Sequence, residues 1–137
     1  MENEFVSYIQ AVDLKELGFN EKGFMSYDKE GHLRYFMDAE RFYKYSEDPL
    51  AITPIWAPTY SQAFRWMREK HLTYGIISPT NVSKIQGIDC ILEIHPPPDK
   101  HGIVYILEDG KLYTSYEEAE LACLDKLIEL VKVNENI

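Results

Sequence analysis

The clearest pattern of hydrophobic and polar positions lies in the last third of the chain. Two apolar runs, at residues 103–107 and 112–114, flank a short polar segment that contains Asp109 and Gly110. Asp-Gly between such runs is typical of a hairpin turn, because both residues tolerate a positive φ. Ser115 and Glu118 then match the capping-box pattern, which marks the start of a helix. The sequence therefore predicts a hairpin that leads directly into the last helix.

The same capping pattern occurs twice earlier in the chain. Ser7 precedes Gln10 by three positions, and Thr59 precedes Gln62 by three positions. The first pattern predicts a helix to about residue 17, where Gly18 is a natural terminator. The second predicts a helix from residue 60 to about 71. Its apolar stripe is formed by Tyr60, Ala63, Phe64, Met67 and His71.

The last helix has an unusually broad apolar arc. It is formed by Tyr116, Ala119, Cys123, Leu124, Leu127, Ile128, Leu130 and Val131. Such an arc predicts burial on two sides, either between a sheet and another helix or at a subunit contact. Glu120 projects into this arc. It is either a functional acid with a perturbed pKa or merely a first-turn residue favoured by the helix dipole, and we favour the second interpretation.

Alternating or continuous apolar runs predict the strands. A polar, glycine-containing turn at 28–31 joins the first two strands, and a turn at 78–81 follows the third. Prolines within 38–58 favour an ordered loop with a short extended piece. The expected strands cover residues 23–27, 32–37, 74–77, 90–94 and the final hairpin.

Together these elements predict an α+β fold. We expect an antiparallel sheet of about four to six strands, built from hairpins, with three helices packed mainly on one face. The chain has 137 residues, 45% of them hydrophobic and 27% charged, which is ordinary globular composition. A single globular domain over residues 1–137 is therefore expected.

Charge narrows the range of partners. The net charge of −9 argues against nucleic-acid binding, because affinity for phosphates comes mainly from Lys and Arg. The acids either keep the protein soluble or form a surface that meets a basic partner. The first residues are acidic and no apolar run approaches the ~18 residues of a membrane span, so we expect a cytoplasmic protein with no membrane segment.

The residues that could support chemistry do not form a known catalytic or metal-binding pattern. Cys90, Glu93, His95 and His101 could ligate zinc, but they lack the close spacing of closed zinc sites. Strand alternation also places Glu93 and His95 on the face opposite Cys90. Neither a nucleophile elbow nor a glycine-rich phosphate loop is present in the sequence. We therefore predict no catalytic residue, metal ligand or cofactor.

Aromatic residues give a better indication of binding. Trp66 lies at the rim of its helix stripe, and Trp56 lies in the proline-rich approach to that helix. Tryptophan and arginine are enriched at interface hot spots. The candidate interaction surface consists of Trp56, Tyr60, Arg65, Trp66 and Arg68. The alternative for the tryptophans is ordinary packing at the rim of the core.

Three blocks of the chain, at residues 14–19, 55–70 and 116–128, resemble a group of small phage and prophage proteins from Bacteroides-type bacteria. That group has no established activity and therefore no catalytic residues to carry over. The resemblance implies an accessory protein of a mobile element, expressed in the cytoplasm of a bacterial host cell.

These observations lead to one main hypothesis and two alternatives. The main hypothesis is a non-enzymatic accessory protein that binds a host or phage protein through an acidic, aromatic-bearing surface and modulates a host process. The first alternative is a small-molecule-binding protein or enzyme with a pocket on the sheet face. The second is a virion structural component, which stable self-association would favour; a homo-oligomer stays open for the main hypothesis too.

Overall fold

The computed structural model describes residues 4–35, 54–80, 89–96, 107–108, 113 and 115–135. The chain divides into two compact units, Met1–Thr59 and Tyr60–Ile137. The first contains α1 (Tyr8–Glu16), β1 (Met25–Tyr27), β2 (Leu33–Tyr35) and β3 (Ile55–Trp56). The second contains α3 (Tyr60–His71), β4 (Tyr74–Thr80), β5 (Asp89–His95), β6 (Leu107–Glu108) and α4 (Tyr116–Glu135). The single domain expected from the sequence stays a prediction.

Both ends of α1 follow from the sequence signals. At its start, the Gln10 amide donates to Ser7 Oγ at 3.2 Å, and the Ser7 amide donates to Gln10 Oε1 at 3.1 Å. At its end, Gly18 has a φ of 103° and the Phe19 amide donates to the Leu14 carbonyl at 2.9 Å. This is a Schellman motif, in which glycine accepts the left-handed conformation without strain. The predicted helix and its capping box are confirmed.

The first unit contains an antiparallel sheet in the order β2-β1-β3. The central Ser26 lies opposite Arg34 on one side and Trp56 on the other. The Tyr27 hydroxyl donates a buried hydrogen bond of 2.6 Å to the Val6 carbonyl, which ties the segment before α1 to the sheet. The predicted first hairpin is confirmed, and β3 is the short extended piece expected within 38–58.

The second unit contains an antiparallel sheet in the order β4-β5-β6. Its register runs from Tyr74 opposite His95 to Thr80 opposite Asp89. The turn predicted at 78–81 is therefore wrong for residues 78–80, which continue β4. Proline within a sheet is confined mainly to edge strands, and β4 is an edge strand among those described, so Pro79 is compatible with this strand. Glu108, expected in the final turn, belongs to β6; residues 109–112 lie outside the described part.

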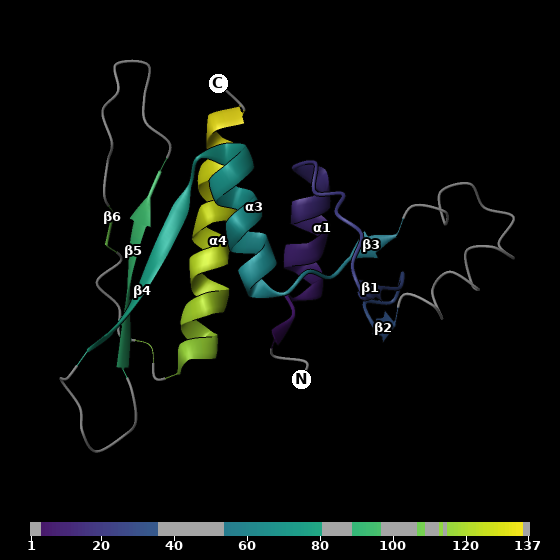
Figure 1. The fold of residues 1–137 in the computed structure, drawn as a ribbon, viewed down its shortest axis with the longest axis horizontal. Coiled ribbons are helices and arrows are strands. Elements are labelled where there is room, and N and C mark those ends of the chain that lie inside the picture. Colours follow the sequence, from purple (N-terminus) through teal and green to yellow (C-terminus); the bar gives the residue numbers. More distant parts are fainter. Residues whose placement is uncertain are drawn as a thin grey trace, which may run out of the picture. The chain divides into compact units, whose positions relative to one another are not determined.

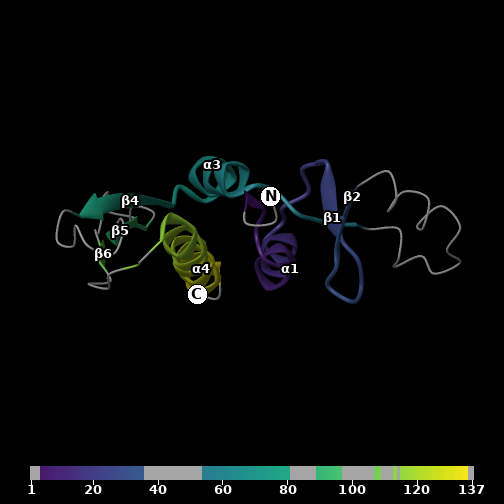
Figure 2. The same ribbon diagram turned by 90° about the horizontal axis from the view of Figure 1, so that it is seen from below.

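Helices α3 and α4 pack on the same side of this second sheet (Figure 1), as the view from below also shows (Figure 2). Helix α4 contacts β4, β5 and α3, so its broad apolar arc is buried between the sheet and a helix, which is the first of the two predicted alternatives. Tyr116 departs from the prediction because it is exposed. The buried residues of the arc are Ala119, Cys123, Leu124, Leu127, Ile128 and Val131.

Close packing of α4 on the sheet depends on Gly75 of β4. A Cβ atom at this position would overlap Cys123 Sγ and would lie 3.3 Å from Ile94 Cδ1. Cys123 and Ile94 are themselves buried, so neither has open space to move into. Glycine is therefore the residue that lets the strand and the helix approach this closely.

The α+β class, the first two antiparallel strand pairs and the three expected helices are present in the described part of the chain. The final hairpin, expected over residues 103–114, lies mostly outside it. The single sheet of about four to six strands is wrong, because the described strands form two separate sheets of three strands each. Apolar alternation predicts which face of a strand is buried and which neighbours pair in a hairpin. It does not determine whether two hairpins join the same sheet. None of the described helices is apolar over a length that would cross a bilayer.

Candidate functional site

The outer face of β4 and β5 carries the most concentrated set of functional side chains in the second unit. Side chains alternate along each strand. Gly75 and Ile94 face α4, and the residues on either side of them therefore point away from the helix. The outer-face residues are Tyr74, Ile76, Glu93 and His95.

Three of these side chains contact one another. His95 Nε2 and Glu93 Oε1 are 2.8 Å apart, which is a hydrogen bond between residues two apart on β5. The Tyr74 ring, directly opposite on β4, stacks on the His95 ring with centroids 4.4 Å apart and an interplanar angle of 5°. Tyr74 is 39% exposed, whereas His95 is only 7% exposed. Tyr74 is thus the outer layer of the stack and His95 the inner layer.

The contacts of Glu93 and His95 bear on the possible zinc ligands considered from the sequence. Glu93 and His95 share a face, as strand alternation predicts, but the side chain of Cys90 and all of His101 lie outside the described residues. Among the side chains that the structure describes, no group of three or more His, Cys, Asp and Glu could hold a metal ion. Glu93 instead orients the imidazole, and together with Tyr74 it presents a carboxylate and an aromatic ring at the surface.

The structure places the five predicted interaction residues differently from one another. Trp56, Tyr60 and Trp66 are buried, with 8%, 5% and 4% of their surface exposed, whereas Arg65 and Arg68 are exposed on α3. Trp56 belongs to the first unit and the other four to the second. This corrects the placement of the three aromatic side chains on an exposed surface. A binding role for the two arginines stays a prediction.

Trp66 is buried because the inward face of α3 is wider than the predicted stripe. Ala63, Trp66 and Met67 are all buried along this helix, and Phe64 is half-buried. The Trp66 ring packs edge-on against His71, with centroids 4.8 Å apart and an interplanar angle of 65°. A large side chain at the rim of a helix can turn its ring inward, so the position of its Cα underestimates its burial.

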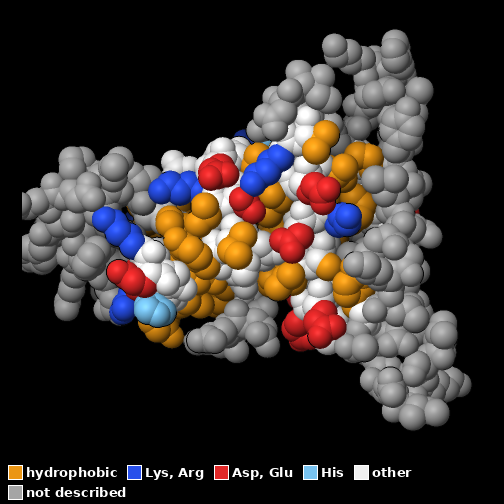
Figure 3. Space-filling view, turned by 180° about the vertical axis from the view of Figure 1, so that it is seen from behind, with side chains coloured by type: hydrophobic (Ala, Val, Ile, Leu, Met, Phe, Trp, Pro, Cys, Tyr) orange, Lys and Arg blue, Asp and Glu red, His pale blue; other side chains and the backbone are white. Residues whose placement is uncertain are grey.

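The exposed side of α4 presents a regular row of residues spaced four apart. Each neighbouring pair lies on successive turns, and every step of four residues advances about 40° round the helix, so the row winds across the exposed side of α4. Leu121 and Val133 are 43% and 55% exposed, and the three acids of the row are exposed as well. Figure 3 shows acidic and hydrophobic side chains next to one another on this face of the molecule. We call this set the α4 row; it consists of Glu117, Leu121, Asp125, Glu129 and Val133.

Glu120 lies beside the α4 row and is half-buried. Burial raises the pKa of its carboxyl above the usual value, and the negative charge of Glu117 raises it further. The side chain is therefore an acid with a perturbed pKa in the first turns of the helix. The perturbed pKa of the first interpretation is therefore present, and a functional role of Glu120 stays untested.

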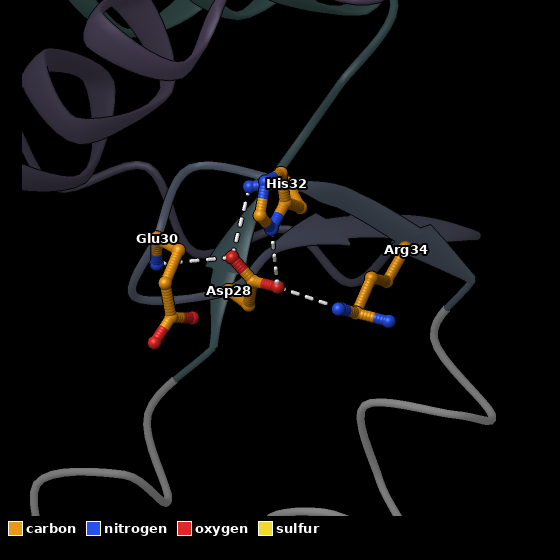
Figure 4. A network of polar contacts seen from close by, with 4 residues as sticks. All are labelled: Asp28, Glu30, His32 and Arg34. Atoms are coloured by element: carbon orange, nitrogen blue, oxygen red, sulfur yellow. Dashed lines mark hydrogen bonds and ion pairs between the residues drawn. The ribbon is translucent and has the colours of Figure 1, made fainter.

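A second polar cluster, shown in Figure 4, lies in the first hairpin. Asp28 Oδ1 accepts hydrogen bonds from the amides of Glu30 and His32 at 3.0 and 2.8 Å, and Oδ2 accepts one from Arg34 Nε at 2.6 Å. Gly31 has a φ of 84°, which completes the turn. Both carboxylate oxygens are used within the hairpin, so the cluster fixes the turn rather than offering a binding site.

Comparisons with protein-family models, with curated proteins and with solved structures found no match to this chain. The resemblance to phage and prophage proteins therefore stays a prediction. The outer-face cluster was only half visible in the sequence, since Glu93 and His95 share a strand face by simple alternation. Tyr74 was missed because its place opposite His95 depends on the register of β4 and β5. A strand-pairing argument from the apolar residues of both strands is the signal that could have found it.

Proposed function

We propose that this protein is a non-enzymatic binding protein that uses the α4 row to hold a basic surface on another protein. The observation that supports the proposal is the composition of the row, in which three exposed carboxylates and two exposed apolar side chains lie on neighbouring turns. Glu129 also forms an ion pair with Lys126, with Oε2 and Nζ 3.8 Å apart, so the test addresses Glu117 and Asp125. Apolar side chains supply contact area, and charges of one sign select a partner of the opposite sign. The net charge of −9 favours the same class of partner.

The proposal keeps the protein–protein interaction predicted from the sequence and moves it to another surface. Trp56, Tyr60 and Trp66 are buried, so the apolar part of the contact comes from Leu121 and Val133. The resemblance to phage and prophage proteins supports an accessory role toward a host or phage protein in the cytoplasm of a bacterial cell.

The experiment is an affinity capture of tagged protein from bacterial lysate, followed by binding measurements with the purified captured protein. The test variant is Glu117→Lys/Asp125→Lys, which reverses two charges of the α4 row. The matched control is Arg65→Glu/Arg68→Glu, which reverses two exposed charges on α3. Both variants change surface positions, where substitutions usually shift stability by less than about 0.5 kcal/mol. Thermal melts check that they are folded.

We expect the captured protein to have a basic surface and to bind the wild type less tightly as the salt concentration rises. Its affinity for the α4 variant should be at least about tenfold lower than for the wild type, because close charge pairs across an interface contribute more than about 1 kcal/mol. The α3 variant should bind like the wild type. Equal binding by the α4 variant and the wild type would overturn the proposal. Loss of binding in the α3 variant alone would instead favour the predicted role of Arg65 and Arg68.

A further inference from the structure

The second unit has another surface, on the outer face of β4 and β5, whose aromatic ring and carboxylate play no part in the proposed function. On the outer face of β4 and β5, the Tyr74 ring is stacked on His95 from one side and is 39% exposed. The Glu93 carboxylate is half-buried, and its Oε1 lies 2.8 Å from His95 Nε2, within hydrogen-bond distance. An ionised carboxylate offers about four acceptor positions, so Glu93 can accept further hydrogen bonds.

We propose that this surface binds the side chain of an arginine presented by a partner protein. A guanidinium group is planar, stacks on aromatic rings and forms hydrogen bonds with carboxylates. Tyr74 supplies the ring, Glu93 the carboxylate, and the exposed Ile76 an apolar surface for the arginine methylenes. His95 is a positioning residue, because it contacts both the ring and the carboxylate from below.

Arginine fits this surface better than other planar or cationic groups. A nucleobase could stack on Tyr74, but its phosphates would meet the Glu93 carboxylate and a chain of net charge −9. A lysine ammonium could pair with Glu93, but it lacks the planar face that stacks on a ring. The surface is on the opposite side of the sheet from α4, so this proposal does not rest on the α4 row.

The test measures the fluorescence anisotropy of two labelled peptides. One alternates glycine with arginine, and the other alternates glycine with lysine at the same length and charge. The protein's overall acidity attracts both peptides alike, so the ratio of their dissociation constants isolates the arginine site. A cation–π contact is open to both cations, whereas planar stacking on the ring is open only to the guanidinium, so we expect roughly twofold to fivefold tighter binding of the arginine peptide.

Variants of Tyr74 and Glu93 locate this preference. Tyr74→Phe keeps the ring and should keep the preference, whereas Tyr74→Leu removes the ring and should bring the ratio to about one. Glu93→Gln keeps a side-chain hydrogen-bond partner for His95 but removes the charge, and it should weaken arginine-peptide binding. Thermal melts of all three variants confirm that they are folded. Comparison of Tyr74→Phe with Tyr74→Leu distinguishes the loss of the aromatic ring from a general effect of substituting this strand position.

The outcomes separate this proposal from the proposed function. Equal affinities for the two peptides in the wild type, or a preference that persists in Tyr74→Leu, would overturn the arginine site. The α4 variant Glu117→Lys/Asp125→Lys should lower the affinity for both peptides and leave their ratio unchanged. Salt-dependent binding of both peptides with no arginine preference would thus contradict the proposed arginine site without contradicting the proposed role of the α4 row.

Discussion

The packing of α4 on β4 makes a definite prediction for the substitution Gly75→Ala. The added Cβ would overlap Cys123 Sγ, and Ile94 Cδ1 would be 3.3 Å away. The sulfur is one bond from the Cβ of Cys123 on a helix that contacts both strands, so it has little freedom to move aside. We expect the variant to be less stable than the wild type, even though alanine is ordinarily better than glycine within a strand.

The magnitude follows from two opposing terms. Replacing glycine by alanine in a strand stabilises the fold by about 0.5–1 kcal/mol through chain entropy. Forcing an extra methyl group into a packed core is destabilising by about 1–3 kcal/mol. With the middle of each range, the net effect is a loss of about 1 kcal/mol, or a melting temperature lower by about 3–5 °C for a chain of this size.

A double-mutant cycle tests the cause. Cys123→Ala alone removes a buried sulfur, which is destabilising by about 1 kcal/mol. In the double variant Gly75→Ala/Cys123→Ala, the new methyl group takes part of the space left by the sulfur, so its stability should lie within about 1 kcal/mol of the wild type. Urea unfolding of the four proteins, followed by circular dichroism, gives the free energies. Additive effects of the two substitutions would refute this explanation.

Three further predictions concern single positions. Ser26 Oγ is buried in β1 without a hydrogen-bond partner among the described atoms. Ser26→Ala should therefore leave the free energy of unfolding in urea unchanged or raise it by about 1 kcal/mol, and a loss above about 1 kcal/mol would show that the hydroxyl does have a partner. Leu72 has a φ of 53° after α3 and is exposed. Leu72→Gly relieves about 1–2 kcal/mol of strain, the chain entropy of glycine offsets about 0.5–1 kcal/mol of it, and the melting temperature should therefore rise only slightly. Partial burial raises the pKa of the Asp28 carboxyl, but the hydrogen bonds and charges of Arg34 and His32 outweigh this and lower it from 3.8 to about 2. Because the folded-state pKa is depressed, the stability that Asp28 contributes is present above pH about 4 and is lost as the pH falls toward 2. Unfolding measured over this pH range should show a smaller loss of stability in Asp28→Asn than in the wild type.

Local signals in the sequence predicted the helices well. Ser7 with Gln10 and Gly18 define α1 through contacts within a few residues, and Ser115 accepts a hydrogen bond from the Glu118 amide at 3.1 Å at the start of α4. Such contacts depend only on neighbouring residues, so the local sequence is sufficient to specify them.

Features that depend on distant residues were predicted less well. The division of the strands into two sheets, the continuation of β4 through Pro79 and the burial of Trp66 all depend on partners far away in the sequence. For the candidate site, alternation alone put Glu93 and His95 on one face. The stacking of Tyr74 on His95 needed the register of two strands, which the sequence leaves open.

The position of Pro79 has a consequence for aggregation. An edge strand such as β4 exposes unpaired backbone groups, and its exposed Tyr74 and Ile76 would add apolar contact to a strand from another molecule. Proline lacks the N–H group that a continuous intermolecular ladder would need. Proline on an edge strand is one of the devices that make the edge a poorer template, and Pro79 therefore disfavours the addition of a strand from a second chain to β4.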